Sequence, residues 1–186
     1  MKFIETPLKG AYIAHLTPFV DHRGKFTRLF CEKELVEIKF KKRIVQINDS
    51  FTSKKGTVRG MHYQLPPFSE TKIVKCIKGA IFDVFIDIRR ESPTFLQYHS
   101  EILSEDNMKM LIIPEGFAHG FQTLEKNTEV IYFVTGFYNK DSERGIRYND
   151  PLLNIPWSIE INDVSEKDKN YELLDRNFKG IERDSL

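Results

Sequence analysis

Cysteines and long apolar runs are scarce in this chain of 186 residues. No segment approaches the roughly 18 consecutive apolar residues that a membrane-spanning helix needs, and the N-terminus lacks the apolar core of a signal peptide. The two cysteines, Cys31 and Cys76, lie far apart and outside any CxxC pattern, which is typical of free thiols in a reducing compartment. We therefore predict a cytoplasmic protein without a disulfide framework and without a membrane partner.

The chain also lacks an excess of charge of either sign. Its 28 basic and 27 acidic residues leave a formal net charge of +1, so no overall field attracts nucleic acid. The basic residues 39–43 are interpreted as a solvated turn. Residues 1–186 are expected to form a single domain, because a chain of this length buries a full core without disulfides.

Short segments with strand-like patterns account for most of the chain. Several of them alternate between two faces, as Asp83 and Phe85 do against Val84 and Ile86. Turn signals such as Lys78-Gly79 separate the segments at a spacing typical of β-sandwiches and barrels. The expected strands cover residues 25–30, 44–51, 72–77, 80–88, 109–113 and 129–138.

Only two segments have helical patterns. Residues 32–40 place Leu35 and Ile38 on one face, and residues 165–174 begin with Ser165 as a suitable N-cap. Because helix is so limited, the expected fold is an all-β barrel with small helical additions.

The segment from residue 56 to residue 79 resembles a metal-binding motif of β-barrels with one ligand missing. Such a site uses His-x-His on a strand, because alternate residues point to the same side. Here His62 is followed at the second position by Gln64, whose amide binds transition metals poorly. We therefore predict a pocket without a metal. Arg59 and Lys72 make that pocket suitable for an anionic organic ligand.

A second motif supports the barrel interpretation. Residues 114–121 follow an apolar run and contain Pro-x-Gly-x-x-His, which turns a strand sharply and directs His119 inward. Each motif alone is weak evidence. In this order within one small β domain, the two resemble the two-part signature of the cupin jelly rolls.

Further segments narrow the resemblance to one family. They lie in the same order and at the same spacing as in the dTDP-4-dehydrorhamnose 3,5-epimerase family, from about residue 18 to residue 168. The resemblance implies a homodimer of cupin-type double-stranded β-helices (jelly rolls) with short peripheral helices. The matching segments are residues 21–26, 46–50, 56–64, 87–94, 114–121, 143–146 and 149–150, together with Tyr132.

The resemblance also implies a reaction and its catalytic residues. A 4-keto sugar has C–H bonds at C3 and C5 beside the carbonyl, and removal of either proton gives an enolate. His62 is the expected base, oriented by Asp168, because an imidazole ionises near neutral pH. Lys72 is expected to stabilise the enolate oxygen, and Tyr132 matches the proton donor. Such proton transfer requires no metal and no redox cofactor.

The expected substrate is a nucleotide-diphosphate sugar, and its binding residues follow from the same resemblance. Arginines would contact the diphosphate or the sugar, because guanidinium groups offer paired donors to phosphate oxygens. Polar side chains would contact the nucleotide and line the ligand, and an aromatic ring would stack on the base. The phosphate or sugar ligands would be Arg23 and Arg59, and the nucleotide contacts Gln46 and Asn48. The residues lining the ligand would be His119, Glu143 and Lys167, and the stacking ring would be Tyr138.

Arg28 departs from the family, which usually has glutamate at this position. The expected substrate is dTDP-4-dehydro-6-deoxyglucose, inverted at C3, C5 or both, but a reversed charge near the ligand leaves the nucleotide open. The alternative is an epimerase for another nucleotide sugar, such as a GDP-linked 4-keto heptose used in surface polysaccharide synthesis. Outside this class, a metal-dependent cupin and a non-catalytic sugar-nucleotide binding protein remain the alternatives.

Overall fold

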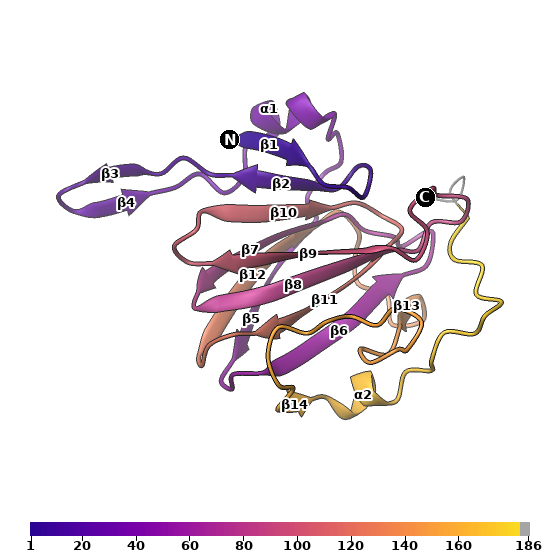
Figure 1. Cartoon of the computed structure of the whole chain (residues 1–186). Coiled ribbons are helices and arrows are strands. Elements are labelled where there is room, and N and C mark those ends of the chain that lie inside the picture. Colours follow the sequence, from indigo (N-terminus) through magenta and orange to yellow (C-terminus); the bar gives the residue numbers. More distant parts are fainter. Residues whose placement is uncertain (183–186) are drawn as a thin grey trace.

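The computed structural model describes residues 1–182, which form two facing β-sheets with few and short helices (Figure 1). The first sheet has six strands in the order β1-β2-β10-β7-β12-β5, and all its neighbours are antiparallel. Its strands are β1 (Lys2–Glu5), β2 (Tyr12–His15), β5 (Gln46–Thr52), β7 (Lys72–Lys78), β10 (Lys109–Ile113) and β12 (Thr128–Val134).

The second sheet faces the first and carries most of the two sequence motifs. Its order is β13-β6-β11-β8-β9. The short β14 pairs in parallel with the beginning of β6, whereas β13 pairs with the end of β6. Its strands are β6 (Thr57–Gln64), β8 (Ala80–Asp87), β9 (Tyr98–Ser104), β11 (Phe117–Thr123), β13 (Glu143–Gly145) and β14 (Asp163–Val164). The predicted all-β jelly-roll class is confirmed.

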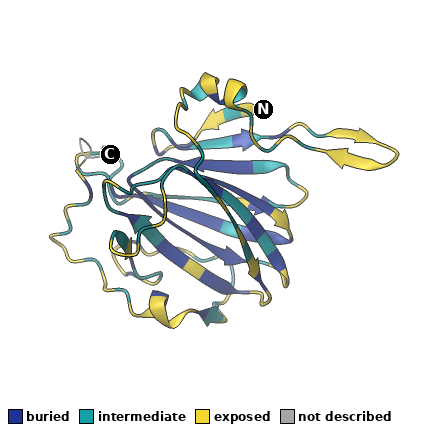
Figure 2. Cartoon of the chain, turned by 180° about the vertical axis from the view of Figure 1, so that it is seen from behind, coloured by how far each residue is buried: buried dark blue, intermediate teal, exposed yellow. Residues whose placement is uncertain are grey.

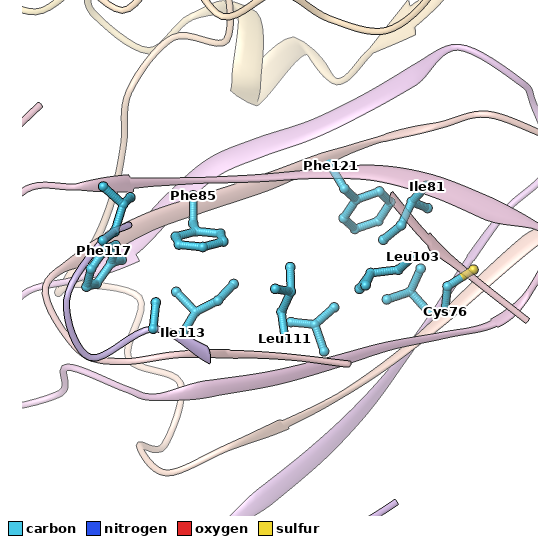
Figure 3. Packing of buried hydrophobic residues seen from close by; sticks show 12 residues of the cluster. Cys76, Ile81, Phe85, Leu103, Leu111, Ile113, Phe117 and Phe121 are labelled. Atoms are coloured by element: carbon cyan, nitrogen blue, oxygen red, sulfur yellow. The ribbon is translucent and has the colours of Figure 1, made fainter. Parts of the chain in front are cut away.

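The main core fills the space between the sheets, as Figure 3 shows. Leu111 and Cys76 from the first sheet meet Phe85 and Phe121 from the second, and all of them are buried. Each buried side chain of this size contributes about 1.5–3 kcal/mol relative to an exposed one. Val74, Phe121 and Val130 of this core also border a cavity between the sheets.

The predicted strands differ from the observed ones mainly at their ends. Residues 109–113 form β10 as expected, and 72–77 and 80–88 differ from β7 and β8 by one residue. The predicted strand at 25–30 is wrong for most of its length, because β4 (Gly24–Phe26) is only the second arm of a hairpin. The chain beyond Phe26 has no regular structure before α1.

Both predicted helices exist but are shorter than expected. The first is α1 (Glu32–Leu35), continued by the 3₁₀ turn η1 (Val36–Ile38) and ended by Lys39 in the left-handed region, with φ of 58°. The second is α2 (Glu166–Lys169), and Ser165 is its N-cap as predicted. Beyond α2 the backbone amide of Leu174 donates to Asp150, so a tertiary contact replaces further helical turns.

A hairpin of β3 (Phe19–Asp21) and β4 projects away from both sheets (Figure 1). It is exposed over its whole length (Figure 2), and its Phe19 and Phe26 rings are 68% and 66% exposed. The two rings lie next to each other, with centroids 6.4 Å apart, and form an exposed aromatic surface.

No helix within residues 1–182 is long and apolar enough to cross a membrane.

Candidate active site

Two adjoining cavities lie where the second sheet meets β12 and β7 of the first. The larger has a volume of about 450 Å³ and the smaller about 280 Å³. His62, Lys72 and Tyr132 line both of them. Three of the four predicted catalytic residues therefore stand at the junction of the cavities, and Asp168 lines the larger one.

His62 and Asp168 form a hydrogen-bonded pair. The imidazole Nε2 lies 2.6 Å from Oδ1 of Asp168, and the backbone N–H of Gly60 donates to Oδ2 at 3.2 Å. Asp168 is held from its own helix as well, because its backbone N–H donates to Oγ of the cap residue Ser165 at 3.1 Å. The parallel pairing of β14 with β6 brings α2 to this edge, so residues over 100 positions apart in sequence meet here.

The environment of Asp168 favours the ionised carboxylate. Its side chain is only 4% exposed, and burial alone would raise its pKa. Hydrogen bonds from His62, Gly60 and Ser165, together with the charge on His62, outweigh burial and hold the pKa of Asp168 below its usual value. The His62 ring is 30% exposed, so its other face is accessible from the cavity.

Lys72 lies beside His62 and Glu70. Its Nζ donates to the backbone oxygen of His62 at 3.4 Å and is 3.4 Å from Oε1 of Glu70. Both side chains of this ion pair are 13% exposed. An ammonium that is largely removed from water and borders both cavities is well suited to stabilise a developing oxyanion.

Tyr132 enters the cavities from β12, on the opposite sheet from His62. It is flanked by Asn48 on β5 and Val74 on β7. Burial raises the pKa of Tyr132, the negative charge of Glu70 raises it further, and Arg59 partly opposes both. The phenol is therefore kept in its protonated form, as a proton donor requires.

A second His–Asp pair stands next to the first. His119 on β11 is directly opposite His62 in the β11–β6 ladder, and its Nε2 lies 2.9 Å from both carboxylate oxygens of Asp83. Complete burial raises the pKa of Asp83, while His119 and Lys72 oppose that rise. His119 lines the larger cavity with a side chain only 10% exposed.

Gln64, the residue at the position of the missing metal ligand, is fully engaged with the backbone. Its amide nitrogen donates to the oxygens of Phe68 and Phe137, and its Oε1 accepts from the N–H of Asn139 at 2.7 Å. The amide thus ties two loops together at the mouth of the smaller cavity. Among residues 1–182 no three His, Cys, Asp or Glu side chains are grouped to hold a metal ion.

Several predicted binding residues line the cavities and already have partners that orient them. Nε of Arg59 donates to Thr52, and Gln46 donates to Asn48 at 2.8 Å. Lys167 contacts Glu143 at 2.5 Å, and Glu143 accepts from the hydroxyl of Tyr138 at 2.9 Å. Tyr138 is 58% exposed, which leaves its ring free to stack at the cavity entrance.

Two of the predicted binding residues, Arg23 and Arg28, line neither cavity. Arg23 lies on the projecting hairpin, where it contacts Asp21 at 2.6 Å and its side chain is 78% exposed. Arg28 contacts Glu34 of α1 at 2.8 Å, and Glu34 also binds the N-terminal amine. These two cations lower the pKa of Glu34 to about 2. The positive charge of Arg28 is thus paired with Glu34 of α1, and the Arg28 side chain does not line the cavities of its own chain.

The sequence interpretation missed two acidic residues of the site. Asp83 lies in the alternating pattern of β8, on the inward face with Phe85, and this alternation was the available signal for a buried carboxylate. Glu70 pairs with Lys72, two residues further along the chain. Neither contact is visible in the spacing of the residues.

A jelly roll whose cavity combines a His–Asp pair, a lysine and a protonated tyrosine has the parts of an acid–base isomerase. Comparisons with known proteins agree. The family model described as dTDP-4-dehydrorhamnose 3,5-epimerase matches residues 5–176. The chain is 42% identical over 171 residues to the dTDP-4-dehydrorhamnose 3,5-epimerase of Shigella flexneri. The aligned residues make up 91% of this chain and 94% of that protein.

Solved structures give the same result. The crystal structure of dTDP-4-dehydrorhamnose 3,5-epimerase from Bacillus anthracis with TDP and PPi bound has a TM-score of 0.90 and 41% identity, covering 93% of this chain and 99% of that one. An epimerase from Legionella pneumophila in complex with dTDP-4-keto-L-rhamnose also has a TM-score of 0.90, with 36% identity and coverage of 98% of both chains. The chain therefore belongs to the dTDP-4-dehydrorhamnose 3,5-epimerase family and is an isomerase.

Proposed function

We propose that the protein converts dTDP-4-dehydro-6-deoxyglucose to dTDP-4-dehydrorhamnose by inverting C3 and C5, with His62 as base, Lys72 as enolate stabiliser and Tyr132 as proton donor. The observation that carries the assignment is that His62 from the second sheet and Lys72 and Tyr132 from the first line the same two cavities. The family membership supplies the substrate class.

The hydrogen bond to Asp168 determines which nitrogen of His62 acts as the base. Asp168 is held ionised, so the neutral imidazole donates Nε2–H to its Oδ1. This tautomer leaves the lone pair on Nδ1, which takes the proton from the carbon beside the carbonyl. The bonding electrons move onto the carbonyl oxygen, where Lys72 offsets the negative charge. Asp168 stabilises the imidazolium that results.

Inversion is completed by a proton from the other side of the sugar ring. Tyr132 stands on the sheet opposite His62, and its raised pKa keeps the phenolic proton available near neutral pH. Transfer of that proton to the enolate carbon restores the carbonyl with the opposite configuration. Both centres flank one carbonyl, so one enolate-stabilising lysine serves both steps.

The nucleotide follows from the relatives and from the residues at the cavity mouth. The related structures hold TDP and dTDP-4-keto-L-rhamnose. In this chain Gln46, Asn48 and Tyr138 line the smaller cavity, where amide groups and an aromatic ring suit a nucleotide. Arg28, which motivated the GDP-linked alternative, is paired with Glu34 and gives no support to it.

The test is incubation of the purified protein in deuterated water with dTDP-4-dehydro-6-deoxyglucose, followed by NMR. We expect deuterium at C3 and C5 and accumulation of the rhamno-configured product. The GDP-linked 4-keto sugar serves as the matched control and should exchange far more slowly. Absence of exchange with the dTDP-linked sugar, or faster exchange with the GDP-linked one, would refute the assignment.

We further propose a homodimer in which the β3–β4 hairpin of one chain reaches the cavity of the other. Arg23 is a predicted phosphate ligand, yet it stands on an exposed hairpin outside its own cavity. The outer face of the edge strand β5 also exposes Ile47 and Phe51, at 57% and 54%. A second copy would cover both surfaces and deliver the guanidinium to the diphosphate.

A complementation experiment tests this arrangement. An Arg23→Ala chain and a His62→Ala chain, each inactive alone, are unfolded together and refolded as a mixture. A mixed dimer contains one cavity with both His62 and the partner's intact hairpin, so activity should return to about a quarter of wild type for random pairing. A mixture that stays inactive while light scattering reports dimers would rule out the shared site, and a monomer would rule out the dimer.

A further inference from the structure

Tyr171, which follows α2, packs against the ring of His62. The two ring centroids are 5.9 Å apart and the planes meet at 65°, an edge-to-face arrangement. Tyr171 lies three residues after Asp168, so one short segment supplies both the carboxylate that binds His62 and the ring that packs on it. Tyr171 itself lines neither cavity.

The space for this ring is provided by Gly145. Gly145 on β13 is the ladder partner of His62 on β6, so the three residues meet at one point of the sheet edge. A Cβ atom on Gly145 would stand 2.2 Å from Cε2 and 2.3 Å from Cζ of Tyr171. The backbone of Gly145 is outside the positive-φ region, so the Tyr171 ring, and not the backbone conformation, requires glycine here.

The ring acts at this point as an apolar group. Burial raises the pKa of Tyr171, so its hydroxyl stays neutral even though Lys167 lowers that pKa in part. The His62 ring is 30% exposed and is tied to Asp168 by one hydrogen bond. Without a neighbour on its edge, the imidazole could rotate away from Asp168, and the tautomer with a free Nδ1 would no longer be fixed.

We propose that Tyr171 is a positioning residue for the base: its ring holds His62 against Asp168, and Gly145 exists as glycine to admit that ring. The inference rests on the proposed function, in which His62 removes the proton. The position of the His62 ring matters for the rate, because a displacement of about 1 Å at a reacting group can cost about 100-fold.

The first test compares Tyr171→Ala with Tyr171→Phe. We expect Tyr171→Ala to lower kcat by about 10- to 100-fold with KM changed by less than about threefold, because the base is misplaced while the ligand contacts remain. Tyr171→Phe keeps the ring and should retain kcat within about twofold. If the alanine variant does not fold, Tyr171→Leu replaces it. An alanine variant with wild-type kcat, or a phenylalanine variant as impaired as alanine, would overturn the inference.

The second test is a double-mutant cycle with Gly145→Ala. In the wild-type background the new Cβ displaces the ring, so kcat should fall about tenfold. In the Tyr171→Ala background the same Cβ meets no ring, and a further loss below about twofold is expected. Equal losses in both backgrounds would show that Gly145 serves the backbone and not Tyr171.

These outcomes are separable from failure of the proposed function. If the wild type exchanges no deuterium into the dTDP-linked sugar, the proposed function fails before any variant is made. If the wild type exchanges and His62→Ala does not, the function stands and the Tyr171 variants test the inference alone. Thermal melts of each variant, with kinetics measured well below the midpoint, distinguish a misplaced base from a loss of folded protein.

Discussion

The pairs His62–Asp168 and His119–Asp83 consist of the same residue types, and their histidines stand opposite each other on β6 and β11, yet their surroundings differ. The His62 ring is three times as exposed as that of His119, at 30% against 10%. Asp168 receives backbone and side-chain N–H groups that keep it ionised, whereas complete burial raises the pKa of Asp83. An imidazole with an open face and an ionised partner, such as His62, is suited to accept a proton. The enclosed His119–Asp83 pair is better suited to stabilise the surrounding structure.

The largest difference is expected when each histidine is replaced by asparagine. His62→Asn removes the proposed base and should lower kcat by about 10³- to 10⁴-fold. His119→Asn, the matched control, should raise KM and lower kcat by less than about tenfold, because the proposed role of His119 is to contact the ligand and not to remove its proton. Steady-state kinetics measure both. Comparable losses of kcat in the two variants would mean that both imidazoles transfer protons.

The two carboxylates should separate activity from stability. Asp168→Asn is expected to lower kcat by about 10²-fold, because the amide no longer fixes the tautomer of His62 or stabilises its cation. Asp83→Asn should leave kcat within about tenfold but reduce the free energy of unfolding by about 1–3 kcal/mol, because the amide satisfies the buried His119 less well. Kinetics and urea titrations of both variants check this. The reverse pattern would exchange the roles of the two pairs.

The acid stability of the fold should also depend on Asp168. Its folded-state pKa is depressed, so it contributes stability above the unfolded value of about 3.9. That contribution is lost as the pH falls through the lower folded-state pKa. Unfolding titrations between about pH 6 and pH 3 should therefore show a flatter pH dependence for Asp168→Asn than for wild type. An unchanged slope would mean that Asp168 gains no net stabilisation on ionising in the fold.

Tyr132 allows the two inversions to be distinguished. Tyr132→Phe removes the proposed proton donor and should lower inversion by about 10- to 100-fold, while His62 can still remove a proton. We therefore expect deuterium exchange to continue with retained configuration at the centre that depends on the phenol. NMR of the product mixture measures this. Normal double inversion in the variant would require another donor.

The smallest expected effect concerns Glu70. Burial and the negative charge of Glu70 both raise the pKa of Tyr132, so Glu70→Gln should lower that pKa. The alkaline limb of the kcat/KM profile should then move to lower pH, because the phenol must be protonated to act. Ser69→Ala, at the adjacent position, is the matched control and should leave the limb in place. A limb that stays in place in Glu70→Gln would mean that Tyr132 does not set it.

Much of the site was predictable because motif spacing and strand alternation are properties of the sequence. His62, Lys72 and His119 come from two short motifs, and Ser165 was recognised as a helix cap. The predicted catalytic roles themselves stay predictions until the variants are measured. The length of the second helix could not be predicted, because the contact of Leu174 with Asp150 joins segments that are distant in the sequence.

The sequence by itself determined the all-β class, the family and the candidate catalytic residues that line the cavities, since period-2 alternation and motifs encode them. Only the tertiary structure decided which groups meet. Asp168 reaches His62 because β14 pairs with β6, Asp83 faces His119 because β8 neighbours β11, and Tyr171 fits because Gly145 has no side chain. Such contacts depend on which strands become neighbours, and that depends on the packing of the whole core and not on any local segment.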